Sequence, residues 1–569
     1  MKFRFAALFG LGLALQAPLP AVCQGNERVS LDSQGMEASG GNRSPDMTSD
    51  GRFVVFASNA PLVPNSQNSK YQIYVRDRQA GTTTLASINN QGVWANQDCE
   101  LPHVSDNGRF VVYQSESGNL SPIDDPASSD IFLRDLQAGI TKRMSLSAGG
   151  NIPSGESFFP EISGYGRFVV FATAATNFSP LDNDSLLDVY LRDRDVDGNG
   201  IFDEPGGVEM VLISVNSRGK KGNSASQRPC ISADGRFVAF QSYASNLVPK
   251  DDNGFWDLFL RDRDPDGNGV FDEPGSVRPL VANRNSFGFI GDGISFFPAF
   301  SSDGRFVAFL SSSKNLIQSD TNGVHDIFLF DRISGTTILV NRSQDGGQTG
   351  RKATFSTLGI SPEGRWVAYA SGSRDIVPGD TNRKWDLFLF DRVTEKTVRV
   401  DLGPGGVEAD GTSGFGYRDS NPNLPLGLGG RFIAFSSEAT NLVPGDTNGL
   451  FDIFVRDRGR VDALILSGPA SVAVGNTATV TLGGAPANLP FRLMASGDLG
   501  GSFLFDHPFD LGPGFKTIAT GITDGAGNAS WTSGPVPAKL AGRTFFLEAR
   551  VDESSGLIWN SPPLRLDVL

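Results

Sequence analysis

A tripeptide of glycine, arginine and an aromatic residue recurs seven times along this 569-residue chain. Each copy opens an apolar run, and in six units an aspartate that starts a second apolar run follows 22 residues after the glycine. Repetition of this kind is typical of chains built from one supersecondary unit used many times. The copies start at Gly51, Gly108, Gly166, Gly235, Gly304, Gly364 and Gly430, with intervals of 57, 58, 69, 69, 60 and 66 residues.

Each unit divides into four short strand-like segments, which we call a to d. Segment a carries a proline six residues before the glycine in five units, b is the apolar run after the arginine, c is the run after the aspartate, and d is rich in Thr and Val. Segments b and c are apolar at consecutive positions, so both faces of each sheet should be covered. Radially packed sheets meet that requirement, which predicts an all-β chain folded as a β-propeller.

The count of segments predicts seven blades. The seventh unit ends after its segment c at Asp457, while residues 28–35 have the pattern of a segment d with no unit of its own. The N-terminal strand is therefore expected to complete the last blade and to close the ring, which removes exposed sheet edges. The propeller is expected to span residues 25–462.

The turn ahead of segment b has a form shared with known proteins. It reads Ser49-Asp50-Gly51-Arg52 in the first unit, Ser232-Ala233-Asp234-Gly235-Arg236 in the fourth and Ser302-Asp303-Gly304-Arg305 in the fifth. These repeats resemble the TolB-like, WD-repeat-like β-propeller family of secreted and periplasmic bacterial proteins. The resemblance implies the fold and a secreted or periplasmic location, and it leaves the function open.

Both ends of the chain differ from the repeat. Residues 1–24 carry Lys2 and Arg4, then an apolar run and small residues, which together predict a secretory signal peptide. No later segment is apolar enough to predict a transmembrane helix. Over residues 463–569, strand-like alternation divided by Gly and Pro turns predicts a small immunoglobulin-like β-sandwich.

Polar residues that recur in every unit are expected to belong to the scaffold. The arginine of each tripeptide starts segment b, and an aspartate closes segment c at the same end of the b–c hairpin. Seven Arg–Asp pairs should therefore tie the seven hairpins, and we predict a structural role for them rather than a catalytic one.

Two units carry acidic, glycine-rich insertions between segments c and d. Alternating oxygen ligands, glycine for a sharp turn and a final acidic pair suit Ca²⁺ in a short loop. The loop could start at Asp193, resembling an EF-hand, or at Asp195; a solvated turn without an ion is the other alternative. We predict structural Ca²⁺ in the compact loop that starts at Asp195. The predicted ligands are Asp195, Asp197, Asn199, Ile201 (through its carbonyl), Asp203 and Glu204, and in the second loop Asp264, Asp266, Asn268, Val270, Asp272 and Glu273.

A second acidic pattern lies in the b–c loops. In the last unit it reads Asp446-Thr447-Asn448-Gly449 and ends at Asp452, the aspartate that starts segment c. The alternatives are an Asx turn that caps the strand and a metal site. The related sets are Asp380/Asn382/Asp386, Asp320/Asn322/Asp326, Asp251/Asn253/Asp257 and Asp182/Asp184/Asp188. The b–c and d–a loops share one face of a propeller, so this rim is a candidate interaction surface.

Charge and histidine content exclude several functions. The formal net charge is −14 with no sustained run of Lys or Arg, which argues against a nucleic-acid binder. His103, His325 and His507 lie in unrelated places, so no Ser-His-Asp cluster is indicated. His103 and Cys230 occupy the same position of segment a in different units, which places them near the channel of a propeller.

We therefore predict a monomeric, non-catalytic binding or scaffold protein for an extracellular or envelope protein or glycan. The alternative is an extracellular hydrolase that acts on glycan or peptide at the channel mouth. Unpaired carboxylates with perturbed pKa values in the channel would favour the hydrolase, whereas an apolar channel would disfavour it.

Overall fold

The computed structural model describes residues 25–459 except 65–69, 124–127, 274, 276, 319, 351–352 and 415–422, and beyond residue 459 it describes strands alone. The described residues contain no α-helix, only β-strands and two short 3-10 turns, Pro404–Gly406 and Leu428–Gly430. None of their elements is a helix with the length and apolar character to cross a membrane. The predicted signal peptide, residues 1–24, lies outside the described residues.

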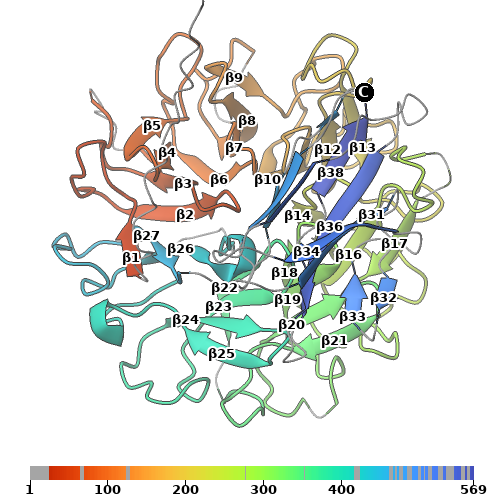
Figure 1. Cartoon of the computed structure of the whole chain (residues 1–569). Helices are drawn as coiled ribbons and strands as arrows, with labels where there is room; N and C mark the ends of the chain where they lie inside the picture. Colours follow the sequence, from red (N-terminus) through yellow and green to blue (C-terminus); the bar gives the residue numbers. More distant parts are fainter. Residues whose placement is uncertain are drawn as a thin grey trace, which may run out of the picture.

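Seven sheets stand radially around one centre, and the colours of Figure 1 follow them around the ring in chain order. This confirms the predicted all-β, seven-bladed propeller. Six sheets contain four antiparallel strands paired in sequence order, with the first strand of each sheet nearest the centre. Their strands are β2 (Asn42–Met47), β3 (Phe53–Ser58), β4 (Gln72–Asp77) and β5 (Thr82–Leu85); β6 (Cys99–Val104), β7 (Phe110–Ser115), β8 (Asp130–Asp135) and β9 (Ile140–Arg143); β10 (Ser157–Ile162), β11 (Phe168–Thr173), β12 (Asp188–Asp193) and β13 (Glu209–Leu212); β14 (Ser226–Ile231), β15 (Phe237–Ser242), β16 (Asp257–Asp262) and β17 (Arg278–Val281); β18 (Ser295–Phe300), β19 (Phe306–Ser311), β20 (Asp326–Asp331) and β21 (Thr336–Leu339); β22 (Ala353–Ile360), β23 (Trp366–Ser371), β24 (Asp386–Asp391) and β25 (Lys396–Arg399).

The seventh sheet combines the two ends of the repeat region. It consists of β26 (Phe432–Ser437), β27 (Asp452–Asp457) and β1 (Gly25–Arg28), in the order β1-β27-β26. β1 runs antiparallel to β27, with Arg28 opposite Phe454. The paired strand starts ahead of the segment 28–35 singled out in the sequence. In the bend that follows it, Leu31 and Glu37 bridge each other.

The second and third strands of each blade are buried on both faces. In β3, Val54, Val55, Phe56 and Ala57 are all fully buried. Val55 and Ala57 pack with residues of the second blade, whereas Val54 and Phe56 pack with residues of the last blade. The consecutive apolar residues are thus explained, because alternate side chains fill opposite inter-blade layers.

The repeated tripeptide forms the contact between neighbouring blades. Gly51 has φ of 73°, and a Cβ atom at this position would lie 2.3 Å from the ring of Phe432 in the last blade. The guanidinium groups of Arg431 and Arg78 lie over that ring, 4.5 and 4.9 Å from its centroid. Only glycine fits the turn and the ring together. The equivalent pairs are Gly108/Phe53, Gly166/Phe110, Gly235/Phe168, Gly304/Phe237, Gly364/Phe306 and Gly430/Trp366.

All seven predicted Arg–Asp pairs are present, with closest N–O distances of 2.7 to 3.0 Å. Their environment differs, since the side chain of Arg52 is 44% exposed and that of Arg305 is 6% exposed. The predicted pairing is confirmed, and the structural role of the pairs stays a prediction. They are Arg52–Asp77, Arg109–Asp135, Arg167–Asp193, Arg236–Asp262, Arg305–Asp331, Arg365–Asp391 and Arg431–Asp457.

Beyond the propeller the chain continues as β-strands. They form a three-stranded sheet β28-β30-β35, a sheet β29-β38-β36-β31-β34 with β37 paired to β36, and the hairpin β32-β33. Side chains here lie outside the described residues, so the immunoglobulin-like sandwich stays a prediction. The strands are β28 (Ile465–Ser467), β29 (Ser471–Val472), β30 (Thr479–Gly483), β31 (Pro490–Ser496), β32 (Ser502–Leu504), β33 (His507–Phe509), β34 (Lys516–Ile522), β35 (Ala529–Thr532), β36 (Thr544–Asp552), β37 (Ile558–Asn560) and β38 (Leu564–Val568).

Candidate functional site

The innermost strands share a bulge that shapes the central channel. In β2 the register shifts between Arg43 and Asp46, and Ser44 has φ of 51°. The same shift and a left-handed residue just before the proline occur in β6, β10, β14 and β18. Such a conformation costs a non-glycine residue about 1 kcal/mol or more, so its repetition indicates a built feature of the blade. The bulge turns the residues on either side of the proline toward the channel.

The residue after the proline differs from blade to blade. Blades one to four carry Asp46, His103, Glu161 and Cys230 there, and blade five carries Ala299. The Arg–Asp pairs repeat around the whole ring, whereas this position does not. It is polar in blades one to three, a thiol in blade four and apolar in blade five.

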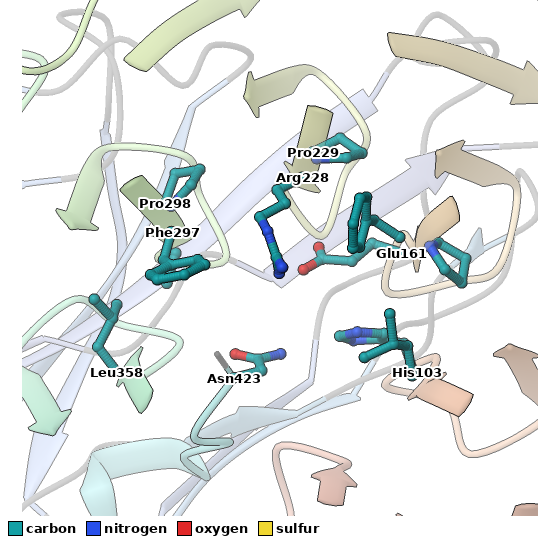
Figure 2. Close-up of a pocket in the computed structure, with 12 residues that line it drawn as sticks. His103, Glu161, Arg228, Pro229, Phe297, Pro298, Leu358 and Asn423 are labelled. Atoms are coloured by element: carbon teal, nitrogen blue, oxygen red, sulfur yellow. The ribbon is translucent and has the colours of Figure 1, made fainter. Parts of the chain in front are cut away.

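Two adjoining cavities occupy the channel, with volumes of about 40 and 160 Å³. His103, Glu161, Ala299 and Asn423 line both cavities. Figure 2 shows the smaller one, with residues from several innermost strands directed toward a common space. The channel is thus neither filled by apolar side chains nor open as a wide pore.

Asp46 and His103 meet across the first two blades. Asp46 Oδ2 accepts the backbone N–H of Val104 at 2.8 Å and lies 3.6 Å from Nδ1 of His103. Burial raises the pKa of the Asp46 carboxyl to about 7, against the opposing effect of hydrogen bonds from Val104 and Met47. Burial lowers the pKa of His103 to about 4, so the imidazole is neutral at neutral pH.

Glu161 and Arg228 face each other in the smaller cavity (Figure 2). Burial, and next the charge of Asp46, raises the pKa of Glu161 to about 8, although its Oε2 accepts the N–H of Ile231 at 3.2 Å. The guanidinium of Arg228 lies between two rings, 4.4 Å from the centroid of Phe159 and 4.9 Å from that of Phe297. Burial lowers the pKa of Arg228 to about 10.

These groups determine what the channel can do chemically. At neutral pH the Glu161 carboxyl is mostly protonated and that of Asp46 is close to half protonated, so the wall offers both hydrogen-bond donors and acceptors. Carboxyl groups with such pKa values also suit general acid–base chemistry. Burial, and then the charge of Glu161, raise the pKa of the Cys230 thiol well above the usual value, which disfavours the reactive thiolate. Cys99 and Cys230 are both free and buried.

The first predicted calcium loop divides its acidic residues between two environments. At the tip, Asn199 Nδ2 donates to Asp197 Oδ2 at 2.9 Å and to Glu204 Oε1 at 2.5 Å. Asp195 Oδ2 accepts the N–H of Gly200 at 3.1 Å, while its buried Oδ1 accepts nothing. Asp203 points away from the tip, where Arg194 donates to its Oδ2 at 2.8 Å. Ile201 is exposed.

The second loop has the same arrangement. Asn268 Nδ2 donates to Asp266 at 3.0 Å and to Glu273 at 2.8 Å. Asp264 accepts the N–H groups of Asn268 and Gly269, both at 3.0 Å. Asp272 is bound by Arg261 and Arg263 at 2.6 and 2.8 Å, and Val270 is exposed. The final aspartate of each loop thus serves an ion pair with arginine, and the loop tip keeps the remaining predicted ligands.

Sequence reasoning placed His103 and Cys230 in the channel but missed Asp46, Glu161 and Arg228. The signal was available: Asp46 and Glu161 occupy the same position after the repeated proline, and Arg228 precedes the proline of its own unit. These residues stand out only as differences between aligned repeats, because the recurring residues belong to the scaffold.

Comparison with known proteins finds only distant likenesses among solved structures. No protein-family model and no curated protein matches the chain. Among solved structures, a TolB from Agrobacterium tumefaciens is 15% identical, with a TM-score of 0.32 over 57% of this chain and 87% of that one. A periplasmic gluconolactonase from Pseudomonas aeruginosa is 16% identical, with a TM-score of 0.32 over 62% and 82%. A family 117 glycoside hydrolase from Zobellia galactanivorans is 12% identical, with a TM-score of 0.23 over 55% and 86%.

The protein is a seven-bladed β-propeller whose central channel holds the polar residues Asp46, His103, Glu161 and Arg228. At these identities and TM-scores, the likenesses carry no argument about what the channel binds or converts.

Proposed function

We propose that this protein is a secreted or periplasmic, non-catalytic binding protein whose central channel receives one group of its ligand. The observation that carries the proposal is the break in the repeat at the residue after the proline. Asp46, His103 and Glu161 put three different polar side chains on one wall, where a purely structural position would repeat as the Arg–Asp pairs do.

The size and chemistry of the channel narrow the ligand class. The larger cavity, about 160 Å³, is close to the roughly 150 Å³ cavity that accommodates a benzene ring. A single side chain or terminal sugar matches this space, and an extended chain exceeds it. With Glu161, Asp46 and Arg228 on the wall, the group would bear both hydrogen-bond donors and acceptors, as a peptide or glycan of the cell envelope does.

A second candidate function, an extracellular hydrolase for glycan or peptide, is favoured by one observation. The carboxyl groups of Glu161 and Asp46 line the cavity system with pKa values of about 8 and 7. A general acid requires a carboxyl group that stays protonated near the working pH, and Glu161 meets that requirement.

The test compares the wild type with Glu161→Gln, which keeps the size of the side chain and an acceptor for the Ile231 N–H. The thermal midpoint is measured with a panel of mono- and disaccharides and dipeptides, and the same mixtures are examined by mass spectrometry. A probe that raises the wild-type midpoint more than that of the variant supports binding in the channel. Cleavage by the wild type alone supports the hydrolase, and no response to any probe contradicts both.

For the hairpin loops we propose structural Ca²⁺ held at each tip. In the first loop Asp195, Asp197, Asn199 and Glu204 supply side-chain oxygens and Ile201 its carbonyl, and the proposal rests on their convergence. The double variant Asp197→Asn/Asp266→Asn should lose part of the rise in thermal midpoint that calcium gives over chelator. An identical calcium response in this variant would contradict the proposal.

Three further assignments belong to this proposal. Residues 1–24 act as the signal peptide, on the charge and hydropathy pattern already described. β1 closes the ring as the outer strand of the last blade, supported by its pairing with β27. Residues 463–569 form an immunoglobulin-like sandwich that attaches or presents a monomeric propeller, supported by strand-like alternation.

A further inference from the structure

Each b–c loop ends at the first residue of the third strand, and that residue is buried in every blade. Blades four to seven build an Asx turn there: in the last blade Asn448 Oδ1 accepts the N–H of Leu450 at 2.7 Å, and its Nδ2 donates to Asp452 Oδ2 at 2.9 Å. The Asx turn, one of the two alternatives for this sequence pattern, is therefore present in these blades. The buried residue is Gln72 in blade one and otherwise Asp130, Asp188, Asp257, Asp326, Asp386 and Asp452.

A second hydrogen bond to this buried residue comes from a side chain two residues beyond the end of the outer strand. In blade three Ser214 Oγ donates to Asp188 Oδ1 at 2.7 Å and accepts the N–H of Val189 at 3.2 Å. Six of the seven blades make the same two bonds, so a side-chain donor at this position is part of the repeat. The donors are Ser30, Ser87, Ser145, Ser214, Asn283 and Asn341.

Basic side chains approach some of these loops in addition to the repeated donor. Nζ of Lys221 lies 2.7 Å from Asp188 Oδ2, the oxygen that Ser214 leaves free. In the last blade Nη1 of Arg28 lies 3.3 Å from Asp446. A cation thus accompanies the donor in these blades and does not replace it.

Blade six carries an aspartate, Asp401, where the other blades carry the donor. It lies two residues beyond Arg399, the end of β25, and the N–H of Val400 donates to the carbonyl of Leu387 at 2.9 Å, as its counterparts do elsewhere in the ring. A serine hydroxyl or an asparagine amide can donate a hydrogen bond, whereas a carboxylate can only accept one. Asp401 can therefore supply the repeated bond only when it carries a proton.

The oxygens of the two aspartates match this requirement. Both oxygens of Asp401 and Oδ2 of Asp386 are buried without a hydrogen-bond partner in the part of the chain that the structure describes. Asp386 Oδ1 accepts from Asn382 at 2.7 Å, so Oδ2 is the oxygen that takes the repeated donor in the other Asx-turn blades. Two charged carboxylates buried side by side without a donor are strongly unfavourable, and one shared proton removes that cost.

The surroundings of the pair favour the protonated form. Burial, and next the charge of Asp386, raises the pKa of Asp401 well above its ordinary value of 3.8. Ser413 and the N–H of Leu387 lie close enough to oppose this rise, although neither makes a hydrogen bond of ordinary geometry with Asp401. Burial also raises the pKa of Asp386 to about 6.

The charged side chains around the pair do not supply the missing donor. Arg399 Nη1 lies 3.9 Å from Asp386 Oδ2, which is too long for a hydrogen bond. Its guanidinium is paired with Glu408 and Asp380 instead. The charged groups that face the pair are Asp380 and Glu408 from the flanking loops, Arg399 from β25 and Arg456 from β27.

We infer that Asp401 is protonated at neutral pH and donates a hydrogen bond to Asp386, which makes blade six a pH-sensitive element of the ring. Loss of the proton leaves two adjoining buried carboxylates with no donor between them. Because Asp401 directly follows β25, the outer strand of blade six should loosen first, while the other six blades keep neutral donors. Neither aspartate lines the channel cavities, so the inference is independent of the proposed function.

The direction of the pH dependence follows from the raised pKa. In the unfolded chain Asp401 titrates near its ordinary pKa of 3.8, so above this value the folded protein holds one proton more than the unfolded chain. The contribution of the pair to stability is complete below the ordinary pKa. It falls as the pH rises toward the native pKa.

The test replaces Asp401 with the residue that blades four and five already have. Asp401→Asn keeps the shape of the side chain and supplies a donor that does not titrate. Relative to this variant, the unfolding equilibrium constant of the wild type should grow by up to about tenfold per pH unit between about pH 5 and 8. Urea unfolding measures it, with Asp252→Asn at an exposed position of blade four as the control. Parallel curves for the wild type and Asp401→Asn overturn the inference.

Two further measurements locate the effect. Deuterium uptake by native β25 should increase more with pH in the wild type than in Asp401→Asn, whereas β21 of blade five, which Asn341 follows, should behave alike in both. The infrared difference between the wild type and Asp401→Asn at neutral pH should contain the carbonyl band of a protonated carboxyl group, because Glu161 and Asp46 contribute equally to both proteins. A difference that contains only carboxylate bands overturns the inference.

The reverse variant keeps the inference testable if Asp401→Asn fails to fold. Asn341→Asp places a carboxyl group beside Asp326 in blade five, as Asp401 lies beside Asp386 in blade six. It should add a second protonated carboxyl band and lose stability relative to the wild type as the pH rises. An Asn341→Asp protein with an ionised carboxylate and an unchanged pH dependence overturns the inference.

Discussion

The b–c hairpin ends and the channel wall of the same blades use polar residues in opposite ways. At the hairpin ends one Arg–Asp pair recurs seven times with nearly constant distances. At the channel wall one backbone position, fixed by a repeated bulge, carries Asp46, His103, Glu161 and Cys230 in turn. The difference teaches that in a repeat protein the scaffold is recognised by what recurs and a site by what varies on a recurring backbone.

The largest effect should come from the repeated glycine, which tests the scaffold side of this contrast. At Gly235, φ is 78° and an added Cβ would lie 2.1 Å from the ring of Phe168, so Gly235→Ala combines strain with a clash. We expect the free energy of unfolding to fall by about 3–5 kcal/mol. Gly219→Ala, with φ of 70° and no atom within 4 Å, is the matched control and should cost about 1 kcal/mol. Equal losses in urea unfolding would show that the inter-blade contact contributes little.

The Arg–Asp pairs should matter in proportion to their burial. Arg305→Met leaves the carboxylate of Asp331 without its partner in a site where the arginine is 6% exposed, and we expect a loss of about 2 kcal/mol. Arg52→Met removes the same pair where the arginine is 44% exposed, and the loss should be much smaller because water screens the pair. Urea unfolding of both variants checks this. Similar losses would mean that the contribution of a pair to stability does not depend on how deeply its arginine is buried.

The channel side of the contrast predicts a pH dependence opposite in sign to that of the hairpins, where the paired arginines lower the pKa values of aspartates such as Asp77 and Asp391. Glu161 has an ordinary pKa of 4.5 and a native pKa of about 8, so between these values the folded protein binds more protons than the unfolded chain. The free energy of unfolding should therefore fall as pH rises through this range, by about 1–2 kcal/mol, because the half-buried side chain still reaches channel water.

Glu161→Gln should remove this contribution, so the variant gains stability relative to the wild type as the pH is raised. The groups facing Glu161, namely Asp46, Arg228, His103 and Cys230, remain in both proteins. Urea unfolding at about pH 5, 7 and 8.5 measures the difference. Glu209→Gln, at the exposed first residue of the outer strand β13, is the control and should follow the wild-type curve. Parallel curves for Glu161→Gln and the wild type would show that the pKa of the Glu161 carboxyl group is not raised in the folded protein.

The smallest expected effect concerns Cys230, the fourth member of the varying position. Because its thiol pKa is raised well above the usual value, the native protein should take up no iodoacetamide at about pH 8, at Cys230 or at Cys99, whereas the unfolded protein should react at both. Mass spectrometry after labelling reads this out. Rapid labelling of native Cys230 would mean that the reagent reaches the channel and that the thiol is deprotonated there. The channel wall would then include a nucleophile.

Much of the scaffold could be predicted from the sequence because its signals are local. Gly51, Arg52 and Phe53 lie within one turn, and Asp77 closes the hairpin that Arg52 opens, so spacing alone pairs them. The expected strand, residues 28–35, and the observed strand β1 differ because the local sequence does not mark where a strand ends and the following bend begins. The end of β1 is defined by a non-local contact, the pairing of Arg28 with Phe454.

The candidate sites depended on contacts that spacing does not reveal. Asp46 approaches His103 from another blade, and Arg228 lies between rings of Phe159 and Phe297 from two others. Whether an aspartate of a b–c loop is balanced depended on a strand outside its loop, as with Lys221 and Asp184 or Arg28 and Asp446.

By itself, the sequence determined the repeat, the four strands of each blade, the number of blades and the pairs that hold each hairpin, because these follow from periodicity and from neighbours along the chain. Only the tertiary structure decided which side chains share the channel and which acidic pockets have a cation. Those contacts exist only when the blades stand around one axis, which brings residues from separate units together.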